Sequence, residues 1–438
     1  MALKIWLPLN KNKLSQGVDD VTATTQGTAV LSGESLYFGT TNANGSLYFT
    51  PSLFTGYTEM SVSFFVKFYS FDADYSCVFG FFNSTTGYVN AAKVLCLGKI
   101  GNTTATTASF EVYGADLGSN IVSQSVALNK WVHFAITYKN KVLKLYQDGV
   151  LVASKTYTAN INFANIQRVA FGQSLNNGNR RHCNCRMYDL RIYDNEISAK
   201  EVSEASKGLI LHYKLSPYTI SDVAKDCSGF GNDGTYAALT SASLTNNSPR
   251  YDESVTFTTG AAKYIVTSSI DKTDIQNNFT VSWWSNSSNM HGKMAWGGDS
   301  TGNRLNLYPS TASTSGFCWN TGDGGKNPIK TDGGALIKVA PYNDSKWHHY
   351  AMVGDGTNGK LYIDGVYKGK AETYKGLTSP TMYISGWDTS TSYRWGGMIS
   401  DFRLYATVLS ADDILELYHT AASVDNKGNF FCGEIKEE

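Results

Sequence analysis

Paired carboxylates are the residues of this sequence that could support hydrolytic chemistry. A glycosidase flanks the scissile bond with two carboxyl groups, and an E-x-D-x-x-E string on one strand achieves this because alternate residues share a face. The 438-residue chain contains no such string. Neighbouring acids such as Asp19-Asp20, Asp72 with Asp74, and Asp412-Asp413 fall in predicted turns or at a helix start. Solvation or helix capping explains all of them, so we predict no glycosidase site.

Motifs for other catalytic chemistries are also missing from the sequence. It has no H-E-x-x-H zinc motif and no G-x-x-x-x-G-K-[ST] phosphate loop. We therefore predict that the protein is not an enzyme.

Two short segments contain residues that often bind transition metals. His182, Cys183 and Cys185 lie close together, but a tetrahedral zinc site needs four ligands and usually a wider cysteine spacing. We interpret this segment as the tip of a hairpin. His348 and His349 are adjacent on a predicted strand and point to opposite faces, so they cannot chelate one ion together.

Oxygen ligands suited to calcium gather in one glycine-rich turn, from Asp226 to Gly234. Its glycines free backbone carbonyls, and carboxylate, hydroxyl and amide oxygens come from Asp226, Ser228, Asn232 and Asp233. The alternative is an Asx-type turn, in which these side chains bond to the backbone and no ion is needed. The sequence leaves both interpretations open and indicates no other cofactor.

The charge of the chain argues against two classes of partner. Lys plus Arg and Asp plus Glu both number 37, so the formal net charge is zero and no long-range field favours nucleic acid or an anionic membrane. No apolar run is long enough for a membrane helix, and the apolar stretch at the N-terminus is too short for a signal peptide. We expect a soluble protein made in a cytoplasm, with its seven scattered cysteines as thiols.

An internal repeat divides the chain into two copies of one unit. The segment N-K-W-V-H-F-A around Trp131 matches S-K-W-H-H-Y-A around Trp347. In both copies an Asp-Gly turn follows at the same interval, and D-L-R-I-Y in copy one matches D-F-R-L-Y in copy two. Each copy runs from a matched first strand to a closing helix. We predict domains over residues 1–207 and 208–422 and a docking or linker tail over 423–438.

The closing helix of each copy has a start signal. Ser198 with Glu201, and Ser410 with Asp413, stand at the N-cap and N3 positions of a capping box. An apolar residue precedes each cap and is expected to pack onto the first turn of the helix. These residues are expected to shape the fold and to have no chemistry of their own.

The composition and the order of the motifs define the fold class. Gly (41), Tyr (27) and Phe (21) are abundant, and short strands alternate with frequent turns, which is typical of an all-β sandwich. The succession of the D-x-S-G-x-G-N-x-G turn, the W-H-H strand, the L-Y-I-D-G hairpin and the S-D-F-R-L-Y strand resembles the laminin G-like branch of the concanavalin A-like lectins and glucanases.

This resemblance implies two tandem antiparallel jelly-roll β-sandwiches, each closed by a short helix. Some relatives of this kind hold calcium by loop oxygens, which supports the ion interpretation of the Asp226 turn. Copy one has only Gln16 to Asp20 where that turn should be, so the same site is not expected there. We expect Trp131 and Trp347 to pack in the two cores, since matched aromatic positions usually do.

A sandwich without catalytic acids usually acts as a recognition surface. Sugars are recognised by aromatic faces and by hydrogen-bonding groups on loops. Copy two is rich in both, and four tryptophans outside the matched strands are our candidates for a glycan-facing rim: Trp296, Trp319, Trp387 and Trp395. Copy one has only Trp6 and Trp131, so we expect it to be a spacer.

Tandem domains of this type without a signal peptide resemble the virion proteins of bacteriophages that carry lectin-like adhesion domains, in a tail, fibre or decoration protein. The resemblance implies a location in the virion, with a host cell-surface glycan and other virion proteins as partners, and a homo-oligomer is plausible. The alternatives are an extracellular or cell-surface bacterial adhesin, a carbohydrate-binding module of a larger enzyme, and a decoration protein without a ligand.

Overall fold

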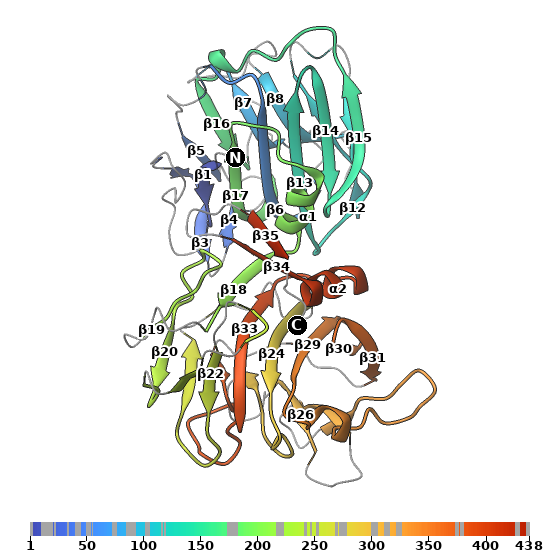
Figure 1. Ribbon diagram of the computed structural model, residues 1–438. Helices are drawn as coiled ribbons and strands as arrows, with labels where there is room; N and C mark the ends of the chain where they lie inside the picture. The colour runs from blue at the N-terminus through green and yellow to red at the C-terminus, as the bar shows by residue number, and fades with distance from the viewer. Residues whose placement is uncertain are drawn as a thin grey trace. The chain divides into compact units, whose positions relative to one another are not determined.

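The computed structural model consists of two all-β units, each a sandwich of antiparallel sheets (Figure 1). The contacts between residues divide the chain into a first unit that ends at Ser206 and a second that begins at Lys207, called unit 1 and unit 2 below. The structure describes residues 3–434 except 10–20, 22, 33–34, 40–44, 50–53, 55, 72–76, 85–92, 101–105, 115–116, 118–119, 173–182, 216–222, 241–242, 246–247, 251–253, 268–269, 271–277, 299–304, 311–315, 321–325, 373–375, 377–380 and 425–429.

Unit 1 has a larger and a smaller sheet. The larger sheet has the order β15 (Val150–Thr156), β14 (Val142–Gln147), β13 (Trp131–Lys139), β6 (Met60–Ser70), β17 (Asn184–Tyr193), β4 (Ser35–Tyr37) and β3 (Val30–Ser32), and β1 (Leu3–Leu7) also pairs with β17. The smaller sheet has the order β11 (Ile121–Val122), β10 (Phe110–Tyr113), β8 (Lys93–Lys99), β7 (Cys77–Phe82), β16 (Arg168–Phe171), β5 (Ser46–Phe49) and β2 (Thr24–Gln26). A short pair, β9 (Thr107–Ala108) with β12 (Val126–Ala127), lies outside both sheets.

Unit 2 repeats this plan. Its larger sheet has the order β21 (Leu244–Thr245), β22 (Ser254–Phe257), β33 (Gly397–Tyr405), β24 (Asn278–Asn286), β29 (Trp347–Asp355), β30 (Gly359–Ile363) and β31 (Val366–Ala371), with β18 (Leu209–Tyr213) also on β33. The smaller sheet has the order β19 (Val223–Ala224), β20 (Gly234–Ala237), β23 (Tyr264–Thr267), β32 (Met382–Ile384) and β25 (Trp296–Gly298). A three-stranded sheet contains β26 (Asn306–Pro309), β27 (Phe317–Asn320) and β28 (Lys326–Pro328). The predicted all-β class with tandem sandwiches is thus confirmed.

The hairpins follow the chemistry of their turns. The β14–β15 and β30–β31 hairpins turn at the predicted Asp-Gly pairs, where Asp148 and Asp364 have φ of 50° and 54° and Gly149 and Gly365 have φ of 82° and 73°. Two positive φ values in succession are what a tight type I′ turn requires, and glycine adopts the second without strain.

Both closing helices begin as predicted. In front of α1 (Ala199–Ser206) the amide of Glu201 donates to Ser198 Oγ at 3.3 Å, and the amide of Ser198 donates to Glu201 Oε2 at 2.6 Å. The capping box of α2 (Ala411–His419) has the same two bonds, between Ser410 and Asp413. The apolar staple is present too, because Ile197 and Leu409 are buried beside their helices.

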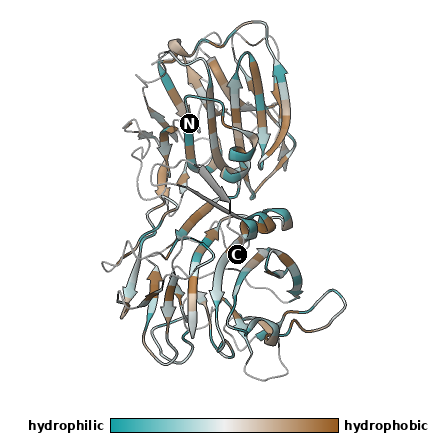
Figure 2. Cartoon of the chain, in the orientation of Figure 1, coloured by the Kyte–Doolittle hydropathy of each residue, from teal (hydrophilic) through white to brown (hydrophobic). Residues whose placement is uncertain are grey.

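Each unit buries its own core between its two sheets, where the hydrophobic colour runs along the central strands (Figure 2). In unit 2 the Trp296 ring of the smaller sheet lies 6.1 Å from Trp283 and 6.2 Å from Phe402 of the larger sheet, so it joins the two layers. The expectation that Trp131 and Trp347 fill the cores is wrong: both are only half-buried, at the starts of β13 and β29. Trp131 instead packs its edge on Tyr188.

The structure also tests the predictions for the cysteines, for a membrane helix and for the C-terminal tail. Cys77, Cys96, Cys183, Cys185, Cys227 and Cys318 are free thiols, as predicted. No helix within the described ranges is long and apolar enough to cross a membrane. The Gln16–Asp20 segment, the Asp72–Asp74 pair and His182 lie outside the described residues. After α2, β34 (Thr420–Val424) pairs with β35 (Phe430–Glu434), so a hairpin begins three residues before the predicted tail.

We expect unit 2 to fold without unit 1, because it contains its own sheets, core and capped helix. Residues 208–422, expressed alone, should be monodisperse and unfold in one cooperative transition, measured by size exclusion and by circular dichroism on heating. An aggregated product, obtained while the full chain stays monodisperse, would show that the domain boundary is misplaced.

Candidate functional site

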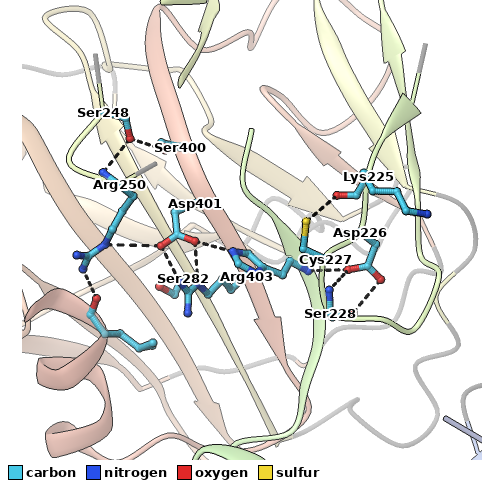
Figure 3. Close-up of polar contacts among 12 residues, drawn as sticks. Lys225, Asp226, Cys227, Ser228, Ser248, Arg250, Ser282, Ser400, Asp401 and Arg403 are labelled. Carbon is cyan, nitrogen blue, oxygen red and sulfur yellow. Dashed lines mark hydrogen bonds and ion pairs between the residues drawn. The ribbon is translucent and has the colours of Figure 1, made fainter. Parts of the chain in front are cut away.

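A buried charged centre lies in the larger sheet of unit 2. Asp401 Oδ1 accepts hydrogen bonds of 2.8 Å from both His212 Nε2 and Arg403 Nε (Figure 3). Its Oδ2 accepts from Arg403 Nη2 at 3.0 Å and lies 3.8 Å from Arg250 Nε. All four side chains are buried, and Arg250 also donates to the Leu417 and Tyr418 carbonyls at the end of α2. The centre therefore joins β18, β33 and the closing helix.

The protonation of this centre follows from its charges. Burial would raise the pKa of Asp401, but the Arg403 charge and the His212 hydrogen bond outweigh it, and the pKa lies well below its usual value. Burial lowers the pKa of His212 to about 4, and the Arg403 charge adds to the lowering. At neutral pH, a neutral His212 thus donates from Nε2 to an ionised Asp401.

The same centre recurs in unit 1 with one exchange. Asp189 Oδ1 accepts from Arg191 Nε at 2.8 Å and from the indole Nε1 of Trp6 at 2.7 Å, and Trp6 stands where unit 2 has His212. Asp189 and Asp401 have φ of 52° and 50°, beside a register shift in the pairing of β17 with β6 and of β33 with β24. Such a bulge redirects a side chain, here the aspartate toward the arginine two residues later. The D-x-R motif therefore organises the fold.

The predicted calcium turn is closed by protein hydrogen bonds. Asp226 Oδ1 accepts from the amides of His212 and Ser228, and Oδ2 accepts from Ser228 Oγ and the amide of Asn232, all at 2.8 to 2.9 Å. Asp233 accepts from the amide of Asp226 and from Lys225 Nζ, both at 2.8 Å. Figure 3 shows Asp226 turned toward Ser228.

These bonds do not fit a calcium ion. A calcium ligand must direct free lone pairs at the ion, but four protein donors already use both oxygens of Asp226, and its side chain is only 4% exposed. The described residues contain no group of three His, Cys, Asp or Glu side chains placed to hold a metal. The Asx-turn interpretation accounts for the bonds of Asp226, Ser228 and Asp233. Asn232 donates from Nδ2 to the Ile210 carbonyl, and its buried Oδ1 has no hydrogen-bond partner among the described residues.

The buried carboxylates in the described part of the chain are held by structural hydrogen bonds. Its buried carboxylates are Asp189, Asp226 and Asp401, and each accepts hydrogen bonds from groups that hold the fold together. His349 is buried as well, with Nε2 2.8 Å from Ser282 Oγ, whereas His348 is half-buried between Asp344 and Asp364. The two histidines thus point apart, as predicted.

The four tryptophans predicted to form a glycan-facing rim are buried. The exposed fractions are 0% for Trp296 and Trp319, 2% for Trp395 and 8% for Trp387. Trp296 and Trp319 point into the core, where the Trp319 ring lies 6.2 Å from that of Phe279. The prediction of an exposed rim is wrong because the sequence shows only that these residues lie outside the matched strands, and two of them are on strands of their own.

Half-exposed aromatic side chains lie instead on the outer face of the smaller sheet of unit 2. Ile265 and Ile384 are paired and fully buried, so their neighbours Tyr264 and Tyr383 point to the opposite, outer side. The two tyrosine rings lie 5.5 Å apart. Thr235 and Val266, which are paired with each other, lie on the same side. We call Tyr264, Tyr383, Thr235 and Val266 the tyrosine face.

Two residues of the 385–396 loop border the tyrosine face. Arg394 lies 4.3 Å above the Tyr264 ring and donates to the carbonyls of Ser385 and Asp388, so its guanidinium is held by the loop. Trp387 lies over Gly297, where an added Cβ would come within 2.6 Å of Trp387 Cβ. Gly297 is paired with Tyr383, which places Trp387 beside the tyrosine face.

A buried amide lies near this border. Asn306 and Tyr308 share one side of β26, and Tyr308 packs in a cluster with Trp387. Asn306 is fully buried, yet neither its Nδ2 nor its Oδ1 has a hydrogen-bond partner among the described residues. Water or a ligand hydroxyl ordinarily satisfies an amide of this kind.

The sequence analysis missed the tyrosine face, although one signal was present. Tyr264 aligns with Tyr48 at the offset that aligns Trp347 with Trp131. A matched tyrosine inside an alternating strand, unlike a lone tryptophan in a loop, indicates a repeated surface position.

We expect the stability of both units to fall in mild acid. Burial lowers the pKa of His133 and His349 to about 3 and of His212 to about 4, whereas the unfolded chain has about 6.5. The unfolded state therefore binds more protons, and stability present above pH 6.5 is lost as the pH falls toward 4. Each histidine should contribute a slope of up to about 1.4 kcal/mol per pH unit in urea unfolding. In a His349→Gln variant, unfolding should take up one proton fewer, so the free energy of unfolding should depend less steeply on pH. A free energy of unfolding that does not change between pH 7 and pH 5 would contradict the buried neutral histidines.

We expect calcium to have no effect on stability. Calcium chloride or a chelator should leave the melting temperature unchanged, since protein donors already fill the Asp226 carboxylate. Asp226→Ala should cost about 2–4 kcal/mol in both conditions, because several buried donors lose their acceptor. The exposed Asp412→Ala variant is the control. A higher melting temperature in calcium that Asp226→Ala abolishes would restore the ion interpretation.

Comparisons with known proteins agree with this architecture. A family model described as the concanavalin A-like lectin/glucanases superfamily, of laminin G type, matches residues 21–203 and 259–415. A search of curated proteins gives no match.

A search of solved structures gives matches of low identity and low TM-score. Domain 4 of the arabinanase AbnA from Geobacillus stearothermophilus, solved with arabinotriose, is 16% identical over 48% of this chain and 98% of its own, with a TM-score of 0.38. The binding domain of botulinum neurotoxin DC, in complex with SialylT, is 10% identical over 99% of both chains, with a TM-score of 0.37. A Trypanosoma rangeli sialidase mutant is 17% identical over 46% of this chain and 32% of its own, with a TM-score of 0.36.

The family model covers most of both sandwiches, and the repeated larger sheets, D-x-R centres and capped helices account for the match in physical terms. The chain therefore belongs to the concanavalin A-like lectin/glucanase superfamily, with one laminin G-like region in each of its two units.

Proposed function

We propose that this protein is a non-catalytic glycan-binding protein and that the tyrosine face of unit 2 is a binding surface. The observation that carries the proposal is the pair of half-exposed rings, Tyr264 and Tyr383, 5.5 Å apart on a regular strand face. Strands hold both rings in place, so little entropy is lost when a ligand covers them.

The chemistry of this face suits a neutral saccharide. The C–H side of a pyranose ring packs on an aromatic ring, and its hydroxyls need hydrogen-bond partners at the edge of the contact. Thr235 and the two tyrosine hydroxyls stand on the face itself, and Tyr393, half-buried beside Trp387, extends its aromatic border. Arg394 is fully buried and donates to loop carbonyls, so its guanidinium is not exposed to a ligand.

Binding without catalysis is the simpler function for these domains. Glycoside hydrolysis needs two carboxyl groups that face the sugar, one of them able to give up a proton. In the described part of the chain, the buried carboxylates bind the fold's own donors. The family includes glucanases as well as lectins, so an assay for reducing sugar released from wall polysaccharides tests this part of the proposal.

At the level of the organism, we propose a role in host attachment as a bacteriophage virion protein that displays lectin-like domains. A location in the particle, contacts with other virion proteins and a homo-oligomeric state belong to the same proposal. An adhesin, a carbohydrate-binding module or a decoration protein without a ligand would use the same fold. Tail, baseplate or capsid genes beside this gene, and its peptide masses in purified particles, would support the virion role.

We expect loss of the Tyr383 ring to weaken glycan binding. On an array of neutral and acidic oligosaccharides, Tyr383→Ala should lower affinity for the bound neutral glycan about fivefold, since a stacking contact contributes about 1 kcal/mol. Val366→Ser, an exposed change on the larger sheet, is the matched control. Trp296→Ala should instead cost about 3–5 kcal/mol of stability as a core truncation.

Two outcomes would contradict the binding surface. Full-chain protein that binds no glycan on the array would remove the function. Glycan binding that survives in Tyr383→Ala and in Tyr264→Phe combined with Tyr383→Ala would place the site elsewhere.

A further inference from the structure

One histidine of unit 2 lies between two carboxylates. His348 Nδ1 is 2.8 Å from Asp364 Oδ2, and its Nε2 is 3.2 Å from Asp344 Oδ1. The histidine side chain is 15% exposed, so protein shields most of the ring from water. Asp364 belongs to the β30–β31 turn, whereas Asp344 follows the short 3₁₀ helix Ala340–Tyr342. The imidazole therefore joins two segments that are separate in the chain.

Both contacts can be hydrogen bonds only when the ring is protonated. A neutral imidazole has one N–H donor, and an ionised carboxylate only accepts, so the imidazolium alone can donate to Asp344 and Asp364 together. Burial would lower the pKa of His348, but the hydrogen bonds and charges of these two acids outweigh it, and the pKa lies above its usual 6.5. The geometry and the charges thus favour the same protonation state.

The other groups around the ring do not change charge near neutral pH. Tyr342 meets the ring edge-on at 5.3 Å, and Tyr350 lies 6.4 Å from it. Burial raises the pKa of both tyrosines, so both stay neutral. Lys346 Nζ lies 3.9 Å from Asp344 Oδ2, and Ser285, the residue paired with the histidine on β24, is uncharged. Among the described groups at this position, the imidazole is the one that titrates near pH 7.

Unit 1 closes the matching turn without charge. At the offset that aligns the two copies, Leu128 stands in the place of Asp344 and Val132 in the place of His348. Leu128 packs against the core of unit 1, and Val132 is buried in it. An apolar contact in one copy is thus replaced by a contact that depends on a proton in the other.

The segment that carries Asp344 holds further parts of unit 2. Asn343 Oδ1 accepts from the amide of Met290 at 3.0 Å, and the carbonyl of Ser345 accepts from Asn286 Nδ2 at 2.9 Å. Residues 340–346 therefore fasten the end of β24 and the loop that follows it. A change in the hold on this segment reaches that loop.

We propose that His348 is a pH-operated clamp, which fixes the 340–346 segment to the Asp364 turn when it is protonated and releases the segment when it is neutral. In the neutral ring, one nitrogen presents a lone pair to a carboxylate oxygen, so one of the two contacts becomes repulsive. Because the folded state holds this proton more tightly than the unfolded chain does, the stabilisation is complete below pH 6.5. It is lost as the pH rises through the raised pKa. The clamp does not depend on whether unit 2 binds a glycan.

The test measures amide hydrogen exchange of residues 340–346 in the full chain, at about pH 6 and about pH 9, on either side of the titration. Rates are divided by those of an unstructured peptide of the same sequence. Protection of the segment should be roughly tenfold greater at the lower pH, since a charge-assisted hydrogen bond is lost at the higher one. In His348→Val, which installs the residue of unit 1, protection should be equally low at both pH values.

A matched control is present in the same sample. Residues 124–130 form the corresponding turn of unit 1, next to the buried His133, and should be equally protected at both pH values. This turn also reports any general effect of pH on the fold.

A second measurement follows the ring itself. In the full chain with labelled histidines, the His348 resonance, identified by its absence from His348→Val, should titrate above pH 6.5. Asp344→Asn should lower this titration midpoint, because one of the two anionic acceptors loses its charge. If His348→Val fails to fold, the resonance is identified as the one that Asp344→Asn shifts.

Three results would overturn the clamp. These are a His348 midpoint at or below pH 6.5, protection of residues 340–346 that is the same at both pH values, and a pH dependence that persists in His348→Val or is equal in the turn of unit 1.

Discussion

The buried aspartate–arginine pair of the D-x-R strand is the interaction on which both sandwiches depend. In unit 2 it ties β33 to β18 through His212 and lies beside Arg250, which holds the end of the closing helix. Burying an ion pair of this kind costs desolvation energy. Removing one partner leaves an uncompensated buried charge and lowers the free energy of unfolding by about 3–5 kcal/mol. The aspartate reaches its partner only because a bulge with positive φ redirects its side chain. First strand, central strand and helix are therefore set by one charged contact.

The buried carboxylates of unit 2 are used as hydrogen-bond acceptors within the fold. Asp401 is ionised and accepts several hydrogen bonds, and Asp226 accepts four, three from its own turn and one from the amide of His212 on β18. His212 thus links the two acidic residues, with its backbone bound to one and its imidazole to the other. Carboxylates that accept this many hydrogen bonds stabilise the fold.

The repeat shows where the two copies are constrained and where they differ. The buried centre tolerates Trp6 in one copy and His212 in the other, because an indole N–H and a neutral imidazole N–H both donate one hydrogen bond to the same carboxylate oxygen. On the outer face of the smaller sheet, Tyr48 and Tyr264 are matched, whereas Arg168 and Tyr383 differ. A change between charged and neutral aromatic character costs little stability on a half-exposed face and changes the chemistry that the face presents.

The sequence alone determined the tandem repeat, the all-β class, the Asp-Gly hairpin turns and the helix caps. These depend on local conformation and on spacing along the chain, which a sequence displays directly. Only the tertiary structure decided burial. Trp296 and Trp319 are in the core because their strands turn them toward the facing sheet, and Trp131 is half-exposed for the converse reason. The tyrosine face, and the closure of the Asp226 turn by donors as distant as the His212 amide, likewise required the packed layers. Which side of a strand meets another sheet is set by contacts between residues far apart in the chain, and no local pattern records it.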